Sequence, residues 1–133
     1  MNPELSRGPC VDAPPVETIL VVDDDRLMRE AIEAVLSSAG YRVLLANDGI
    51  EALEKYLDQS DAIAMVLMDV TMPRLGGIEA TRRIREIDPG AKIVLSSGCA
   101  EQSVSSAKPC AFLPKPYGAA TLKTMVSQVL RAG

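Results

Sequence analysis

The sequence predicts an α/β domain built on a doubly wound, five-stranded parallel sheet. Short apolar runs alternate along its 133 residues with longer stretches in which apolar residues recur every three or four positions. The short runs are typical of strands buried on both faces, and the longer stretches of amphipathic helices that cover a sheet. Strands that alternate with helices favour right-handed crossovers and helices on both faces. A sheet of this kind commonly has the strand order 2-1-3-4-5.

The elements follow from the apolar pattern and from the residues that interrupt it. A buried strand near the start runs into three aspartates, and the helix after it carries an apolar stripe that Gly40 is expected to end. The predicted strands cover residues 19–22, 41–46, 62–68, 93–96 and 111–113, and the predicted helices cover 26–39, 48–57, 76–87 and 118–131.

The third strand is the longest apolar run, and it ends on Asp69. Met72-Pro73 prevents the strand from continuing, because proline lacks an N–H and restricts the residue before it. Asp69 is therefore expected at the carboxyl edge of the sheet, where such sheets bind ligands. A lone aspartate there would more simply be a turn former or a helix cap.

Asp69 is not alone at this edge, because strands 1, 3, 4 and 5 are neighbours in the order 2-1-3-4-5. Each of these strands ends in polar side chains, which in that order are Asp23 and Asp24, Asp69, Ser97, and Lys115. Three carboxylates repel one another unless a cation joins them, and a site of oxygen ligands suits Mg²⁺. A carboxylate, a metal, a hydroxyl and an ammonium are the groups that phosphoryl transfer to an aspartate requires.

Each member of this set also has a simpler interpretation. The aspartates at 23–25 could cap the first helix, and Ser97 before Gly98 could belong to a turn. Lys115 could be a solvated surface lysine, and Phe112, the only phenylalanine, a core residue. The coincidence of four strand ends favours the chemical interpretation.

With these residues the chain resembles the receiver domains of two-component response regulators, most closely those at the C-terminus of hybrid sensor kinases. The resemblance covers roughly residues 18–131 and implies the flavodoxin-like receiver fold. The motifs that carry it are ILVVDDD at 19–25, VLMDVTMP at 66–73 with Gly76-Gly77, VLSSG at 94–98, and FLPKPY at 112–117.

The resemblance implies that Asp69 accepts a phosphoryl group in a Mg²⁺-dependent reaction. Asp24, Asp69 and the Thr71 carbonyl would bind the metal directly, and Asp23 would act largely through water. The chain would be a phosphoacceptor that assists its own phosphorylation and dephosphorylation, rather than an enzyme.

A conformational switch is also implied. Ser97 and Lys115 would engage the phosphoryl oxygens. Phe112 occupies the position of the switch aromatic, which turns inward when Ser97 moves toward the phosphate, so that the phosphate biases a two-state equilibrium.

The implied partner is a histidine kinase or a histidine phosphotransfer domain that carries a phosphohistidine. The first helix and the loop around Pro116 resemble the surface on which the histidine-bearing helices dock. The proline-rich start and the stop after the last helix favour a terminal module, which could be tethered to a sensor kinase in a longer chain.

Composition excludes several other classes of protein. The net charge of −4 argues against nucleic-acid binding. The longest apolar run has seven residues, which is too short to span a membrane, and no membrane contact is expected. Three cysteines without metal-site spacing predict reduced thiols in a cytoplasmic protein. Residues 1–17, with four prolines, are expected to form a flexible tail or linker, and residues 18–133 the receiver domain.

Two segments of the chain depart from the pattern of the receiver family. Gly76 stands where many receiver domains carry an acid. The stretch from Gly98 to Cys110, between the fourth and fifth strands, is too short for a full helix and two loops. We therefore expect that the fourth helix of the family, which would lie here, is shortened to one or two turns or replaced by an irregular strap. We also expect a monomeric domain. Between Lys115 and Pro116 we expect a cis peptide, because the chain must turn sharply while Lys115 stays aimed at the site.

Two alternatives belong to other classes of function. A haloacid-dehalogenase-type phosphatase also uses an Asp-x-Asp motif after its first strand, but it needs an acidic pair after its lysine, and no acid follows Glu101 here. A phosphate-independent interaction module on the same fold would normally have lost part of the acidic site, which this chain retains in full.

Overall fold

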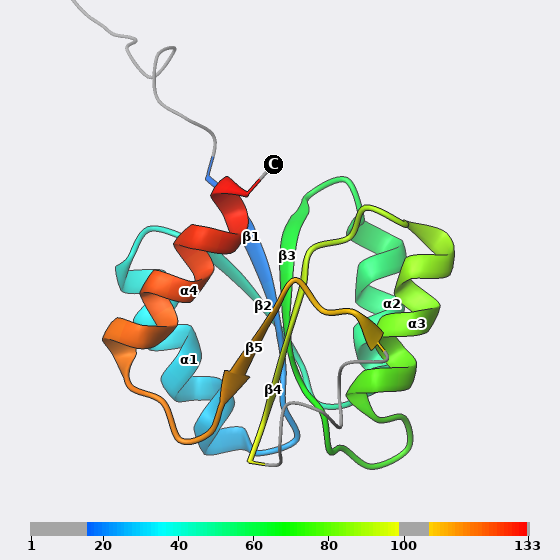
Figure 1. Cartoon of the computed structure of the whole chain (residues 1–133), viewed down its shortest axis with the longest axis horizontal. Coiled ribbons are helices and arrows are strands. Elements are labelled where there is room, and N and C mark those ends of the chain that lie inside the picture. The colour runs from blue at the N-terminus through cyan, green and yellow to red at the C-terminus, as the bar shows by residue number, and fades with distance from the viewer. Residues whose placement is uncertain (1–15, 99–106, 133) are drawn as a thin grey trace, which may run out of the picture.

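The computed structural model describes residues 16–98 and 107–132, and these residues form a three-layered α/β fold (Figure 1). The strands are β1 (Thr18–Val22), β2 (Arg42–Ala46), β3 (Ile63–Asp69), β4 (Ile93–Ser97) and β5 (Ala111–Pro114). The helices are α1 (Arg26–Ser38), α2 (Gly49–Gln59), α3 (Gly77–Ile87) and α4 (Ala119–Arg131). Each element differs from its predicted bounds by at most a few residues.

The five strands are all parallel and have the order β2-β1-β3-β4-β5, which confirms the predicted topology. Three strands, β3, β4 and β5, end one residue later than predicted. Asp69 and Ser97 are the last residues of β3 and β4 rather than the first residues after them. The ladder reaches them because Asp69 pairs with Ser96 and Ser97 pairs with Pro114. Both side chains are therefore placed by the sheet itself.

Two hydrophobic cores lie on opposite faces of the sheet. In Figure 1, α1 and α4 cover one face and α2 and α3 cover the other. Successive strand residues point to opposite faces, so Val21 and Leu67 pack with α1 and α4, whereas Leu20 and Val66 pack on the other side. Because the central strands are buried on both faces, their carboxyl ends have little freedom to move.

Caps and turns fix where the helices begin and end. The Asp25 carboxylate accepts hydrogen bonds from the N–H groups of Leu27 and Met28, so the capping interpretation is right for this aspartate. Gly40 follows α1 with φ of 99°, as predicted for its end. The predicted cis peptide between Lys115 and Pro116 is also confirmed.

Two expectations fall on residues that the structure does not describe. The shortened fourth helix would lie within residues 98–110, of which 99–106 lie outside the described residues, as does most of the predicted tail. Both stay predictions. Within the described part of the chain, no helix is long and apolar enough to span a membrane.

Candidate functional site

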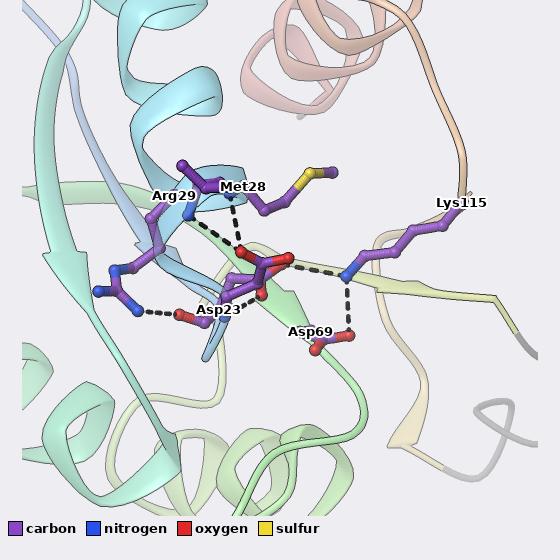
Figure 2. Close-up of polar contacts among 7 residues, drawn as sticks. Asp23, Met28, Arg29, Asp69 and Lys115 are labelled. Carbon is purple, nitrogen blue, oxygen red and sulfur yellow. Dashed lines mark hydrogen bonds and ion pairs between the residues drawn. The ribbon is translucent and has the colours of Figure 1, made fainter.

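An ionic cluster lies at the carboxyl ends of β1, β3 and β5 (Figure 2). The Lys115 ammonium is 3.1 Å from Asp23 Oδ2 and 3.3 Å from Asp69 Oδ1. Asp23 and Asp69 are buried, with 3% and 8% of their surface exposed, whereas the Lys115 side chain is partly exposed. The structure thus brings together residues from three strands that are separated by up to 92 positions in the sequence.

A third carboxylate completes the cluster. One carboxylate oxygen from each of Asp23, Asp24 and Asp69 lies within 4.8 Å of the other two. Asp24 is exposed and the others are buried, so the cluster opens to solvent on one side. A single ammonium does not neutralise three carboxylates, and hard oxygen donors at this spacing suit a divalent cation such as Mg²⁺. The donor set therefore fits the metal predicted from the sequence.

Asp23 is held firmly on the protein side. Its Oδ1 accepts a hydrogen bond of 2.9 Å from the backbone N–H of Asp25, while its Oδ2 faces Lys115. Arg29, one turn into α1, donates a 2.7 Å hydrogen bond to the Asp23 backbone carbonyl (Figure 2). Because both oxygens of Asp23 have protein partners, Asp23 is suited to an indirect role beside the metal. The sequence gives no sign of this contact, because Arg29 is simply one residue of the helix predicted over 26–39.

The electrostatics of the cluster show how closely its charges are coupled. Burial raises the pKa of Asp69; the Lys115 ammonium opposes this shift, and the charges of Asp23 and Asp24 add to it. For Lys115, burial works against the charged form, but hydrogen bonds and charge from Asp23 and Asp69 outweigh it and raise the pKa. Lys115 therefore stays charged at neutral pH, and its charge lowers the cost of ionising the buried Asp69 carboxyl.

Ser97 and Phe112 lie on the face of the sheet that α2 and α3 cover. Ser97 is buried at the end of β4, and its carbonyl accepts a 2.9 Å hydrogen bond from the Lys115 N–H. Phe112 pairs with Leu95, two residues before Ser97, so the two side chains share one face on adjacent strands. Phe112 is half-buried. Thr71 lies two residues after the end of β3 and is exposed, in the loop before α3.

A shallow groove lies beside the cluster, between α1 and the turn into α4. It has a volume of about 140 Å³. Its lining is almost wholly apolar and consists of Met28, Ala31, Ile32, Val35, Tyr117, Gly118, Ala119 and Leu122. Burial raises the pKa of Tyr117 to about 12, so the phenol stays neutral. The groove coincides with the surface that the sequence predicted for docking of a histidine-bearing helix.

Comparison with known proteins gives one consistent result. A family model described as "Response regulator receiver domain" matches residues 19–127. The response regulator MprA of Mycobacterium leprae is 41% identical over 120 residues, which make up 85% of this chain and 50% of that protein. The chain thus spans about half the length of the curated relatives first matched.

Solved structures agree with the family model. A chain in the CheX–CheY–BeF3–Mg²⁺ complex from Borrelia burgdorferi has a TM-score of 0.83 and 29% identity, over 87% of this chain and 90% of that one. A response regulator from Thermotoga maritima in complex with Mg²⁺–BeF has a TM-score of 0.79 and 30% identity, over 86% and 99%.

Replacing Asp69 with asparagine should stabilise the metal-free protein at pH 7. The folded-state pKa of Asp69 is raised above its ordinary value of 3.8, so ionisation opposes folding at neutral pH and an amide avoids this cost. We expect the melting temperature in EDTA to rise by about 3 °C. The gain should shrink as the pH falls through the raised folded-state pKa of Asp69, and it should be lost below 3.8, where the carboxyl is neutral in both states.

The matched control is Glu54→Gln, which neutralises an exposed carboxylate in the middle of α2 and should leave the melting temperature unchanged. An Asp69→Asn protein that melts below the unaltered protein at pH 7 would contradict this account of the cluster.

Proposed function

The chain belongs to the response regulator receiver domain family, and on that premise we propose that it accepts a phosphoryl group on Asp69 from a partner phosphohistidine. The observation that carries the proposal is the contact of one ammonium, that of Lys115, with two buried carboxylates in a cluster of three. Asp69 is the nucleophile in this proposal because it stands at the end of the central strand β3 and shares the lysine with Asp23.

The proposed transfer is an in-line displacement. A carboxylate oxygen of Asp69 forms a bond to phosphorus while the bond from phosphorus to the partner's imidazole nitrogen breaks. Lys115 lies 3.3 Å from Asp69 Oδ1 and can pair with a phosphoryl oxygen, and the Ser97 hydroxyl can donate to another. The partner supplies the energy of the phosphorus–nitrogen bond, so the domain acts as a phosphoacceptor that assists its own phosphorylation and dephosphorylation rather than as an enzyme.

The metal in this proposal is Mg²⁺, held by Asp24, Asp69 and the Thr71 carbonyl. When bound, it neutralises charge on the phosphoryl oxygens. Asp23 acts through water, in keeping with the protein partners that both of its oxygens have. Support also comes from the receiver structures solved with Mg²⁺ and a beryllium fluoride, which resemble this chain in fold.

Two further parts of the proposal concern the response and the partner. Ser97 and Phe112 form the conformational switch, and their shared face on adjacent strands supports this pairing. A histidine kinase or a histidine phosphotransfer domain docks on the groove between α1 and the turn into α4. Cys110 is a free, exposed thiol, in keeping with a cytoplasmic site for this exchange.

We also propose that the domain could be tethered to a sensor kinase in a longer chain. The first curated relatives are about twice as long as the region that they share with this chain. The phosphatase alternative loses its basis, since the chain belongs to the receiver family and has no acid beyond Glu101 to supply the additional pair.

Incubation with acetyl phosphate and Mg²⁺ should label the protein with an acyl phosphate that hydroxylamine releases. Asp69→Asn should abolish labelling because it removes the nucleophile. Lys115→Ala should slow labelling about 100-fold, because a cation aimed at the developing charge is lost. The measurement is the rate of radiolabelled phosphate incorporation, with EDTA as the metal-free reference.

Lys123→Ala is the control, since Lys123 is an exposed lysine on α4 and should not affect the rate. Undiminished labelling of Asp69→Asn would show that the phosphoacceptor is a different residue.

The switch can be followed by fluorescence because the chain has no tryptophan. In a Phe112→Trp variant, Mg²⁺ with beryllofluoride should shift the emission to shorter wavelength as the ring turns into less polar surroundings. The shift should disappear when Ser97→Ala is added, because the hydroxyl couples the adduct to the ring.

Leu57→Trp places the same reporter on the exposed side of α2, where its emission should not change. A Phe112→Trp emission that ignores beryllofluoride, or one that shifts equally without the Ser97 hydroxyl, would refute the switch.

A further inference from the structure

The loop that follows Asp69 is tied to the start of α2 by side-chain and backbone contacts. Arg74 Nη2 and Nε lie 2.5 and 2.7 Å from the same oxygen, Asp48 Oδ2. The Gly49 N–H donates a 3.1 Å hydrogen bond to the Leu75 carbonyl. A Cβ on Gly49 would lie 2.4 Å from that carbonyl oxygen, so the two backbones touch at this point. The loop therefore rests on α2 as well as on the sheet.

Asp48 serves two partners with its two oxygens. Its Oδ1 accepts a 2.9 Å hydrogen bond from the Glu51 N–H and so caps α2, while Oδ2 is left for Arg74. The Asp48 side chain is 6% exposed and that of Arg74 is 58% exposed. The Glu51 N–H lowers the pKa of Asp48, and Arg74 lowers it further against the effect of burial. Asp48 is thus a buried, charged anchor that an arginine reaches from the loop.

The backbone of Arg74 is strained. Its φ is 66°, a left-handed value that residues other than glycine rarely adopt. The Leu75 N–H donates a 2.7 Å hydrogen bond to the Pro73 carbonyl, which closes a three-residue turn around Arg74. Strain of this kind persists only where surrounding contacts hold it, and the ion pair with Asp48 is such a contact. Arg74 thus adopts an unfavourable backbone conformation while its guanidinium contacts Asp48.

The other end of the loop is anchored to the sheet. The Val70 N–H donates to the Ser96 carbonyl at 3.0 Å, and the Val70 carbonyl accepts from the Gly77 N–H at 2.9 Å. Thr71 lies between this anchor and Arg74 and is itself exposed, while its neighbours Val70 and Met72 pack against the core. The position of the Thr71 carbonyl therefore depends on this packing and on the contacts at both ends of the loop.

We propose that Arg74 and Asp48 are a positioning pair that holds the loop between β3 and α3 in the shape that binds Mg²⁺. The inference rests on the proposed function, because it assigns the Thr71 carbonyl and the Asp69 carboxylate to the metal. Neither Arg74 nor Asp48 contacts the metal. They set its affinity by restricting the loop that carries one ligand and follows another.

The experiment is a Mg²⁺ titration of the full chain, followed by the backbone amide resonances of residues 69–71. Asp48→Asn keeps an oxygen for the Glu51 N–H and so keeps the cap, but loses the acceptor for Arg74. Arg74→Lys keeps the charge but not the guanidinium fork. Each variant should weaken Mg²⁺ binding about threefold to tenfold, less than the loss of a direct neighbour of a metal ligand.

The double variant should bind Mg²⁺ no more weakly than Asp48→Asn alone, because both changes break one pair. Arg83→Lys, an equivalent change in an exposed arginine of α3, should leave the affinity unchanged. Melting in EDTA provides the second readout. If the pair had only a structural role, breaking it would lower the melting temperature without changing the dissociation constant for Mg²⁺.

The outcomes separate the two proposals. If the unaltered protein does not bind Mg²⁺, the proposed function fails, and the positioning pair fails with it. If the unaltered protein binds Mg²⁺ and the two variants bind it equally well, only the positioning pair is refuted. Fully additive losses in the double variant would also refute it, because residues that act as a pair cannot lose the same contact twice.

Discussion

The central physical constraint on the site is the mutual repulsion of three carboxylates that the sheet holds at one edge. Oxygens of Asp23, Asp24 and Asp69 lie within 4.8 Å of one another, and two of these acids are buried. Such an arrangement is costly unless cations oppose it, and Lys115 supplies only one positive charge. The cluster therefore favours a divalent metal, whose two positive charges together with that of Lys115 balance the three carboxylates.

The parallel sheet makes that arrangement possible. Burial of the central strands on both faces fixes their carboxyl ends, so Asp69 and Ser97 occupy defined positions without support from flexible loops. The opposite faces then have separate tasks. The α1 and α4 side offers a groove next to the cluster, and the α2 and α3 side carries Phe112 and the contacts that hold the loop after Asp69. Access of a partner and response to phosphate are therefore assigned to different faces in this account.

The sequence predicted the elements, the strand order and the gathering of acids with Lys115, because each depends on local pattern and on one topology. It also predicted the cis peptide before Pro116, which is confirmed. It did not predict Arg29 or the pair of Arg74 with Asp48. An arginine in a helix or loop gives no sign of its partner, and Arg74 meets Asp48 across 26 positions only after α2 and the loop have packed together. Nor could it show which of the aspartates at 23–25 caps the first helix; in the structure Asp25 is the cap.

The most direct measurement is a crystal structure of the full chain grown with Mg²⁺ and beryllofluoride. The account predicts beryllofluoride bonded to a carboxylate oxygen of Asp69, one Mg²⁺ in contact with Asp24, Asp69 and the Thr71 carbonyl, and the Lys115 ammonium against a fluorine atom. An adduct on a different residue, or a metal bound away from these acids while Lys115 still joins Asp23 to Asp69, would contradict it.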